Sequence, residues 1–375
     1  MIDTIKLAVR LNSPLRDANL GFTPRLDSIS PEYFGFFSAH INVNSLDKEK
    51  YYPRLTYVQR PEPVTGTMIF ELLVELSLPK LYFGENFSEL DDGKMFEVAQ
   101  VLLERLKEMG IKLKPSQILN ADVRKIDYSK NIVFSDTPSA AQSIALSLSK
   151  SNVHGRYDCQ HTSYIKSNSK AFHIHTNSLD VVMYDKIADL RSMKTSPKRS
   201  VESSGMFSQD VAARLETLGL ISVPRFEVRL NGKRMIKSTL EKIGKDPRLT
   251  TYTDMFSANI SKQVLLMHWD NIVATIPKTL PDSMDRKSVY LNILKERGMT
   301  PMKSFARLGF MEISSVAGLR WVKDIIYKQF SRFAWRDIKS LNTAPSDDET
   351  SDLDFVRQVI EAMKPVNLWR TEDGE

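Results

Sequence analysis

A tyrosine and a lysine stand two residues apart at the end of an apolar run, in the stretch DVVMYDKIADL (180–190). The run has the composition of a buried strand, and strand side chains alternate between two faces, so Tyr184 and Lys186 are expected to share one face. A tyrosine hydroxyl has an ordinary pKa of about 10 and needs a nearby cation or metal ion to attack an electrophile near neutral pH. The stretch therefore indicates a tyrosine nucleophile assisted by Lys186; the plainer alternative is a tyrosine that packs or lies at an interface.

Three further predicted strands carry a carboxylate near the centre: Glu75 in LLVELSL, Asp127 in VRKIDYS and Glu227 in RFEVRL. The alternation turns both glutamates away from the apolar side of their strands and puts Asp127 on one face with Val123 and Lys125. Carboxylate oxygens suit Mg²⁺ or Mn²⁺, and such an ion can neutralise a phosphodiester and orient it for in-line attack. We therefore expect Glu75 and Asp127 on adjacent strands, within reach of one ion. The alternative is a set of solvated or salt-bridged carboxylates.

The elements that must position these residues fall into two parts. Residues typical of strands, rich in β-branched and aromatic types, dominate up to about residue 235. Strands are predicted at 4–11, 33–44, 55–60, 66–78, 121–134, 171–176, 180–187 and 224–230, and helices at about 92–109, 137–150 and 208–220. Beyond 236 the periodicity is helical, apart from an acidic linker at 342–354, and a last short helix is expected near 353–363. The pattern predicts an α+β domain over 1–235 followed by a mostly helical domain over 236–375.

Composition excludes several classes of protein. The 375 residues are 42% hydrophobic and 26% charged, and 52 Lys and Arg against 46 Asp and Glu give a net charge of +6. This mild excess permits nucleic-acid binding without requiring it. A single cysteine, Cys159, excludes an intrachain disulfide and a cysteine zinc site and fits a reducing cytoplasm. We expect no signal peptide, no membrane span and, without a Gly-rich phosphate loop, no ATP-driven motor.

Several stretches, in their order along the chain, resemble the rolling-circle replication initiators of filamentous bacteriophages. They are similar, more distantly, to the initiators of small Gram-positive rolling-circle plasmids. The matching segments are MIDTIKL, LLVELSLPKL, VRKIDYS, VVMYDKIADL with its Tyr-x-Lys, and VPRFEVRLNGKRMIKS with its Arg-Phe-Glu. The resemblance covers most of the chain and is faint in the helical half, at RLGFMEISSVAG. Each motif is short, so the signal comes from their order and spacing.

The resemblance implies a fold, a reaction and its residues. The fold is the antiparallel, RRM-like sheet of rolling-circle initiators, with helices on one face and the site on the other. Tyr184, with Lys186 beside it, would nick one strand of the replication origin, become linked to the 5′ phosphate and free a 3′-hydroxyl primer, and the strand would later be rejoined without ATP. Glu75 and Asp127 match metal-binding carboxylates for Mg²⁺ or Mn²⁺, and Glu227 matches a third acidic strand position. The implied partners are duplex and single-stranded origin DNA, a host helicase and a DNA polymerase, in the cytoplasm of a bacterial host and without a membrane.

Two histidines and a second tyrosine complicate this assignment. His173 and His175, in HIH, share a strand face and have no counterparts in that family. His-hydrophobe-His binds a metal ion in one large class of DNA-nicking enzymes, but there the tyrosine usually lies on a separate helix; DNA contact or a solvated strand are the alternatives. Tyr164, in HTSYIKSNSK, also has a lysine two residues on. We prefer Tyr184, because the run DVVM would hold it rigidly.

The helical half contains a basic stretch with interleaved aromatics, which either binds the origin duplex or packs as an amphipathic helix with solvated cations. Its cations are Arg320, Lys323, Lys328, Arg332, Arg336 and Lys339, and its aromatics are Trp321, Tyr327, Phe330, Phe333 and Trp335. Two other functions stay open for the whole chain. One is a plasmid mobilisation relaxase, which shares the chemistry; the other is a non-catalytic DNA-binding regulator, whose carboxylates would be surface groups.

Overall fold

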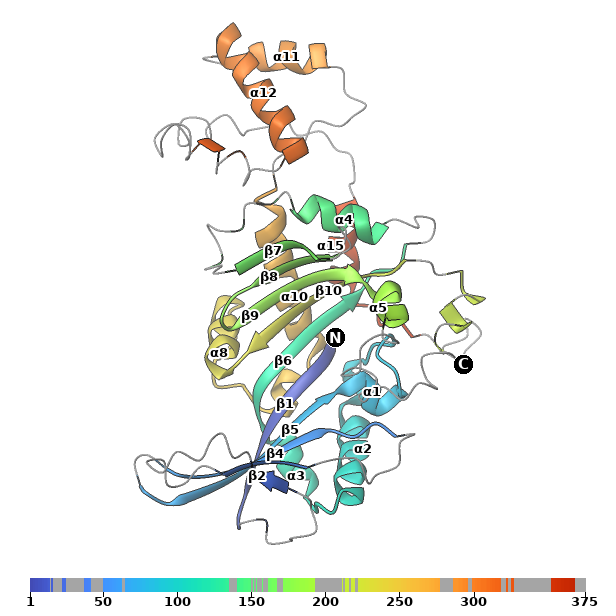
Figure 1. Ribbon diagram of the computed structural model, residues 1–375, viewed down its shortest axis with the longest axis vertical. Helices are drawn as coiled ribbons and strands as arrows, with labels where there is room; N and C mark the ends of the chain where they lie inside the picture. Colours follow the sequence, from blue (N-terminus) through green and yellow to red (C-terminus); the bar gives the residue numbers. More distant parts are fainter. Residues whose placement is uncertain are drawn as a thin grey trace.

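The computed structural model is an α+β protein built on one antiparallel sheet (Figure 1). It describes residues 1–13, 15, 22–24, 37–41, 50–62, 65–134, 140–149, 151, 153, 157, 161–166, 171–192, 211, 213–215, 217–219, 222–276, 286–295, 299–317, 322, 325–326 and 352–367. The ten strands of the sheet lie in the order β2-β3-β4-β5-β1-β6-β10-β9-β8-β7. Seven of them, from β4 to β8 in this order, have described side chains and form the part of the sheet that matters for the site.

The strands are β1 (Ile2–Leu11), β2 (Phe22–Pro24), β3 (Phe37–Ile41), β4 (Arg54–Pro61), β5 (Met68–Ser77), β6 (Asp122–Asn131), β7 (His161–Lys166), β8 (Ala171–His175), β9 (Leu179–Asp185) and β10 (Pro224–Asn231). Period-two alternation buries one face of the sheet, because every second residue is apolar. The core side chains of three neighbouring strands are Ile5, Leu7 and Val9 of β1, Leu72, Val74 and Leu76 of β5, and Phe226, Val228 and Leu230 of β10. The apolar faces predicted for the strands around Glu75 and Glu227 are therefore confirmed.

Helices cover this apolar face. They are α1 (Leu78–Phe83), α2 (Met95–Glu108), α3 (Pro115–Leu119), α4 (Ala140–Ser149), α8 (Lys233–Lys242), α9 (Tyr252–Met255) and α10 (Ala258–Val273). In α2, Val98, Leu102 and Leu106 repeat at helical spacing and are fully buried, as an amphipathic helix on a core requires. Helices α1 and α3 contact β1, whereas α4, α8, α9 and α10 contact strands of the β6–β10 half.

The C-terminal part is more helical and shares the core of the sheet. Helix α10 packs on β6 and β10, and α15 (Asp352–Ala362) packs on α10 and α4. Figure 1 shows α11 (Arg286–Leu294) and α12 (Pro301–Ala317) standing away from the sheet. Among the described helices, none is long and apolar enough to cross a membrane. The division into domains at residue 235 stays a prediction, and most of the basic stretch between Arg320 and Lys339 lies outside the described residues.

The position of β1 changes how the predicted site is laid out. This first strand lies in the middle of the sheet, between β5 and β6. The expectation that Glu75 and Asp127 lie on adjacent strands is therefore wrong, because β1 separates the strands that carry them. A register shift at Arg124 in β6 also interrupts the alternation. Val123, predicted on the face of Asp127, therefore enters the core, whereas Lys125 shares the face of Asp127 as predicted.

A buried ion pair fixes the end of the sheet where the site lies. Lys130 Nζ in β6 lies 2.5 Å from Glu89 Oε2, and both side chains are almost fully buried. Glu89 Oε1 also accepts a hydrogen bond from the backbone N–H of Asn131, and Lys130 donates to the carbonyl of Lys364 just beyond α15. The pair thus joins β6, the segment before α2 and the C-terminal segment.

Removal of one partner should destabilise the fold strongly. We expect Lys130→Met to lower the free energy of unfolding by about 3–5 kcal/mol, because Glu89 would be left buried without its counter-ion. Lys94→Met is the matched control, since the exposed Lys94–Glu97 pair is screened by water and should contribute little. Urea unfolding measures both variants, and equal midpoints for the two would contradict this account.

Candidate active site

The face of the sheet opposite the helices carries the predicted site residues, and we call it the polar face. The register of the strands aligns its side chains in rows that run across the sheet. Successive rows are about 7 Å apart along the strands, because every second residue faces the same way. One row puts Tyr184 of β9 directly opposite Arg225 of β10. Another runs through Asp180, Arg229 and Asp127 on β9, β10 and β6. The charged and reactive residues of the polar face around the predicted site are Lys6, Glu75, Lys125, Asp127, His173, His175, Asp180, Tyr184, Arg225, Glu227 and Arg229.

Tyr184 is half-buried at the end of β9, and its hydroxyl makes no hydrogen bond with the residues that the structure describes. Burial raises the pKa of Tyr184 well above its ordinary value, and the negative charge of Glu227 adds to the effect, whereas Arg225 opposes it. The phenol is therefore protonated near neutral pH. A nucleophilic role requires additional positive charge at this place, such as a metal ion.

Arg225 is the buried cation of this row. Its Nη2 lies 3.0 Å from Asp3 Oδ1 and donates to Ser129 Oγ at 2.7 Å, and its Nη1 donates to the carbonyl of Asn86 at 3.0 Å. Asp3 reaches it because a register shift between Ile2 and Thr4 adds one residue to β1. Although burial alone would raise the pKa of Asp3, the charge of Arg225 holds that pKa below its ordinary value.

Lys186 does not continue the strand as the sequence predicts. Strand β9 ends at Asp185, and Lys186 is the first residue of α5 (Lys186–Ser192). Its backbone N–H donates to the carbonyl of Val223, and its side chain is 1% exposed, with Nζ 3.9 Å from Asp189 Oδ2. Burial and the nearby charge of Arg225 lower the pKa of Lys186 to about 8, so the amine is partly neutral near that pH.

The three predicted metal-binding carboxylates share the polar face but do not meet at one point. Lys125 lies between two of them, with Nζ 3.8 Å from Glu75 Oε1 and 3.4 Å from Asp127 Oδ2. Lys6 Nζ is also 3.4 Å from Glu75, so ammonium groups occupy the space around this carboxylate. Glu75 is partly exposed and ion-paired with both lysines, as a surface carboxylate would be. Its metal-binding role stays a prediction.

Asp127 and Glu227 are two buried carboxylates on the neighbouring strands β6 and β10. Both are nearly inaccessible, and Asp127 Oδ1 has no hydrogen-bond partner among the described residues. Burial raises the pKa of Asp127 to about 7, and the charge of Glu227 contributes, although Lys125 and Arg229 oppose the shift. Glu227 itself accepts a hydrogen bond from Arg229 at 2.8 Å. An unpaired carboxylate oxygen beside a second carboxylate is a place where a hard cation would be stabilised.

A second candidate metal position lies on the hairpin of β8 and β9. His173 Nε2 lies 3.1 Å from Asp180 Oδ1, and His175 Nδ1 hydrogen-bonds to the same oxygen. One nitrogen of each imidazole and one carboxylate oxygen lie within 4.8 Å of one another, and we call these three residues the histidine group. Asn231 Nδ2 donates to the other oxygen of Asp180 at 2.8 Å. Burial tends to raise the pKa of Asp180, but the hydrogen bonds from both histidines and Asn231 lower it below its ordinary value.

The histidine group is the better preassembled of the two positions. Imidazole nitrogens with a carboxylate suit Mn²⁺, Zn²⁺ or Co²⁺, whereas Mg²⁺ prefers oxygen ligands alone. The sequence indicated the two histidines but not Asp180. The signal was present, because the short turn between β8 and β9 pairs His175 directly with Asp180. Tyr164, the competing nucleophile, lies in β7, whose side chains are outside what the structure describes.

Comparisons with protein-family models, with curated proteins and with solved structures find no match. The resemblance to rolling-circle initiators therefore rests on the sequence segments alone. The function and the RRM-like fold that it implies stay predictions, whereas the α+β antiparallel sheet with flanking helices and a more helical C-terminal part is observed.

The buried carboxyl of Asp127 predicts a pH dependence of stability. Its folded pKa of about 7 exceeds the ordinary value of 3.8. Between these two pH values the carboxyl is protonated in the folded chain and ionised in the unfolded chain, so folding takes up a proton. The resulting stabilisation is complete below about pH 4 and is lost as the pH rises through 7, by at most about 1.4 kcal/mol per pH unit. In chelator, Asp127→Asn should therefore flatten the fall in unfolding free energy between pH 5 and pH 8, measured by urea titration.

Asp246→Asn is the control for this measurement. Hydrogen bonds from Arg248 lower the pKa of the exposed Asp246 to about 2, so its carboxyl stays ionised throughout the range tested. The control should keep the slope of the unmodified chain. If Asp127→Asn also keeps it, Asp127 is ionised in the folded chain and the assigned shift is wrong.

Metal titration separates the two candidate positions. We expect Co²⁺ to bind through the histidine group. Loss of an outer-shell partner alone typically weakens metal binding by about tenfold or more, so His173→Ala and His175→Ala, which remove ligands, should each weaken it by at least that factor. Asp127→Asn, which removes charge from the carboxylate pair only, should leave Co²⁺ binding unchanged. Isothermal titration calorimetry measures all three variants, and the reverse pattern would place the ion at Asp127.

Proposed function

We propose that this chain nicks one strand of DNA with Tyr184 as the nucleophile, as the rolling-circle initiators that it resembles do. The observation that carries the proposal is the gathering of Tyr184, the histidine group and the buried Asp127–Glu227 pair on one face of a sheet. His173 belongs to the row next to that of Tyr184, roughly 7 Å along the strands. A phosphodiester lying between them would meet the nucleophile on one side and a metal-binding group on the other.

The chemistry follows from the surroundings of Tyr184. The phenol oxygen forms a bond to phosphorus, the bond from phosphorus to the 3′ oxygen breaks, and that oxygen takes up a proton to become a 3′ hydroxyl. Lys186, with its pKa lowered to about 8, is the base that takes the phenol proton in this proposal. A divalent cation at the histidine group would supply the positive charge that the phosphate oxygens and the phenolate require. The phosphotyrosine ester keeps the energy of the broken bond, so the strand can be rejoined without ATP.

The biological setting belongs to the same proposal. A replication initiator would act on origin DNA in a bacterial cytoplasm. The 3′ hydroxyl of the nicked strand would prime a host polymerase, and a host helicase would be the other partner. A mobilisation relaxase would use the same residues on a transfer origin. A DNA-binding regulator would need neither the tyrosine nor the histidine group, so a covalent adduct would exclude it.

Covalent transfer tests the role of the tyrosine. With Mn²⁺ and 3′-labelled single-stranded oligonucleotides of random sequence, the chain should become labelled in a denaturing gel, because the 5′ phosphate of the labelled fragment is joined to the protein. Tyr184→Phe should abolish the labelled band yet leave the unfolding free energy almost unchanged, since its hydroxyl has no hydrogen-bond partner among the described residues to lose. Tyr164→Phe is the control and should retain the band. Labelling that persists in Tyr184→Phe and disappears in Tyr164→Phe would overturn the assignment.

A further inference from the structure

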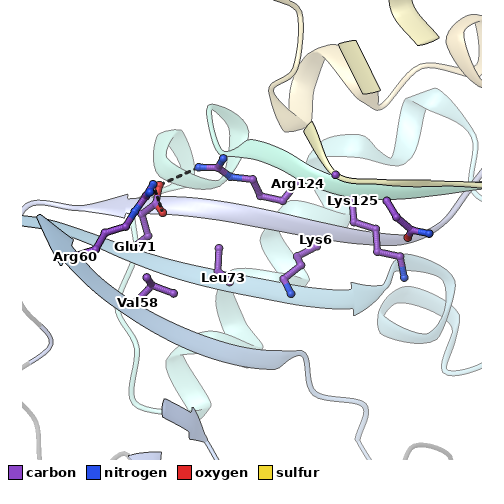
Figure 2. Close-up of a pocket in the computed structure, with 9 residues that line it drawn as sticks. Lys6, Val58, Arg60, Glu71, Leu73, Arg124 and Lys125 are labelled. Atoms are coloured by element: carbon purple, nitrogen blue, oxygen red, sulfur yellow. Dashed lines mark hydrogen bonds and ion pairs between the residues drawn. The ribbon is translucent and has the colours of Figure 1, made fainter. Parts of the chain in front are cut away.

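A shallow depression opens on the polar face beyond the site, over strands β4, β5, β1 and β6 (Figure 2). Its walls carry Lys6, Arg60, Arg124 and Lys125, and its floor is formed by Val58 and Leu73. These six residues define the cationic depression. Figure 2 shows the basic side chains rising on both sides of the apolar floor. Four cations from three different strands on one open surface require an anionic ligand or nearby carboxylates to offset their repulsion.

Carboxylates at the edges of the depression pair with its cations: Glu75 with both lysines, and Asp122 with Arg124 at 3.4 Å. Within the depression itself, Glu71 contacts both arginines. Glu71 lies 3.0 Å from Arg124 Nη2 and 3.4 Å from Arg60 Nη2, so it holds both guanidinium groups at one end of the depression, with Lys6 and Lys125 at the other (Figure 2). The two arginine side chains are still 32% and 34% exposed, whereas that of Glu71 is 15% exposed. Each guanidinium therefore keeps N–H groups for a further acceptor, and Arg–phosphate contacts are the strongest that such a planar donor makes.

The shape of the depression favours a single strand over a duplex. Strands β4 and β6 are three strand spacings apart, so the depression spans roughly 14 Å of backbone, with the arginines meeting over Glu71 at one end. Val58 and Leu73 are partly exposed there and offer an apolar surface to an unpaired base or sugar. A duplex stacks and pairs its bases inside, so it would present mainly phosphates to this floor. A flexible backbone can place its phosphates on the walls and a base on the floor.

The depression is continuous with the candidate active site. Lys125 lines it and also reaches Asp127 at 3.4 Å. Asn231 lines it as well and donates to Asp180 of the histidine group. Chain geometry links them too, because β10 passes into α8 through Asn231 and Gly232, whose φ of +109° favours glycine. We propose that the cationic depression holds the single-stranded DNA that flanks the nicked phosphate. This inference rests on the proposed function and adds where the substrate strand runs.

Binding without cleavage tests the inference. Fluorescence anisotropy of a dye-labelled 20-residue oligothymidine, in chelator and in the Tyr184→Phe background, measures affinity without nicking or metal. We expect Arg60→Gln/Arg124→Gln to weaken binding by about tenfold or more at low salt. The slope of log affinity against log salt should fall by roughly 1.4, about 0.7 for each lost phosphate contact on a single strand. Glu71→Gln should do the opposite and tighten binding, because it removes the depression's own carboxylate.

Controls make the result decisive. Lys94→Gln/Arg248→Gln removes two exposed cations outside the depression and should bind within twofold of the parent. Thermal unfolding checks that each variant is folded. If the double arginine variant fails to fold, Lys6→Gln/Lys125→Gln takes its place in the binding test. A folded depression variant with parental affinity, or tighter binding of a duplex of equal length, would overturn the inference. If these variants lose binding and the unmodified chain forms no covalent adduct, the depression binds single-stranded DNA and the nicking proposal is rejected.

Discussion

The guanidinium of Arg225 is the buried charge on which the arrangement of the polar face depends. It joins β10 to Asp3 of β1, to Ser129 of β6 and to the carbonyl of Asn86. A buried charge without partners would cost several kcal/mol, so these groups must come together for the sheet to form. Tyr184 lies directly opposite Arg225 on the next strand.

The same physical cause acts on the neutral and acidic groups of this face. Burial raises the pKa of Tyr184 and that of Asp127, and the charge of Glu227 raises both further. A cation bound close by would lower both pKa values at once, because it favours the charged forms. In the proposed function, Tyr184 and Asp127 would therefore become ionised together when positive charge arrives. The proposal gives the histidine group to a metal ion and the cationic depression to phosphates.

Much of the sheet could be predicted from the sequence, and the site only in part. Alternation fixed the faces of Glu75, Glu227 and Tyr184, because each strand is regular around those residues. It failed at Val123, where a bulge in β6 inserts one residue, and at Lys186, where the strand gives way to α5. Local periodicity carries no information on either event, since both depend on pairing with a neighbouring strand or loop.

The order of the strands was the other limit. No short motif shows that β1 separates β5 from β6, so the predicted adjacency of the strands that carry Glu75 and Asp127 was wrong, although both faces were right. Asp180 was missed because it sits at the start of an apolar run and looks like a turn residue. Its pairing with His175 becomes evident only when the hairpin of β8 and β9 is drawn in register.

The proposed nicking reaction requires a covalent bond between Tyr184 and DNA. Mass spectrometry of the proteolysed adduct between the unmodified chain and a single-stranded oligonucleotide tests it most directly. We expect a nucleotide on the peptide that contains Tyr184, attached through its 5′ phosphate. A nucleotide on the peptide that contains Tyr164 would contradict the proposal.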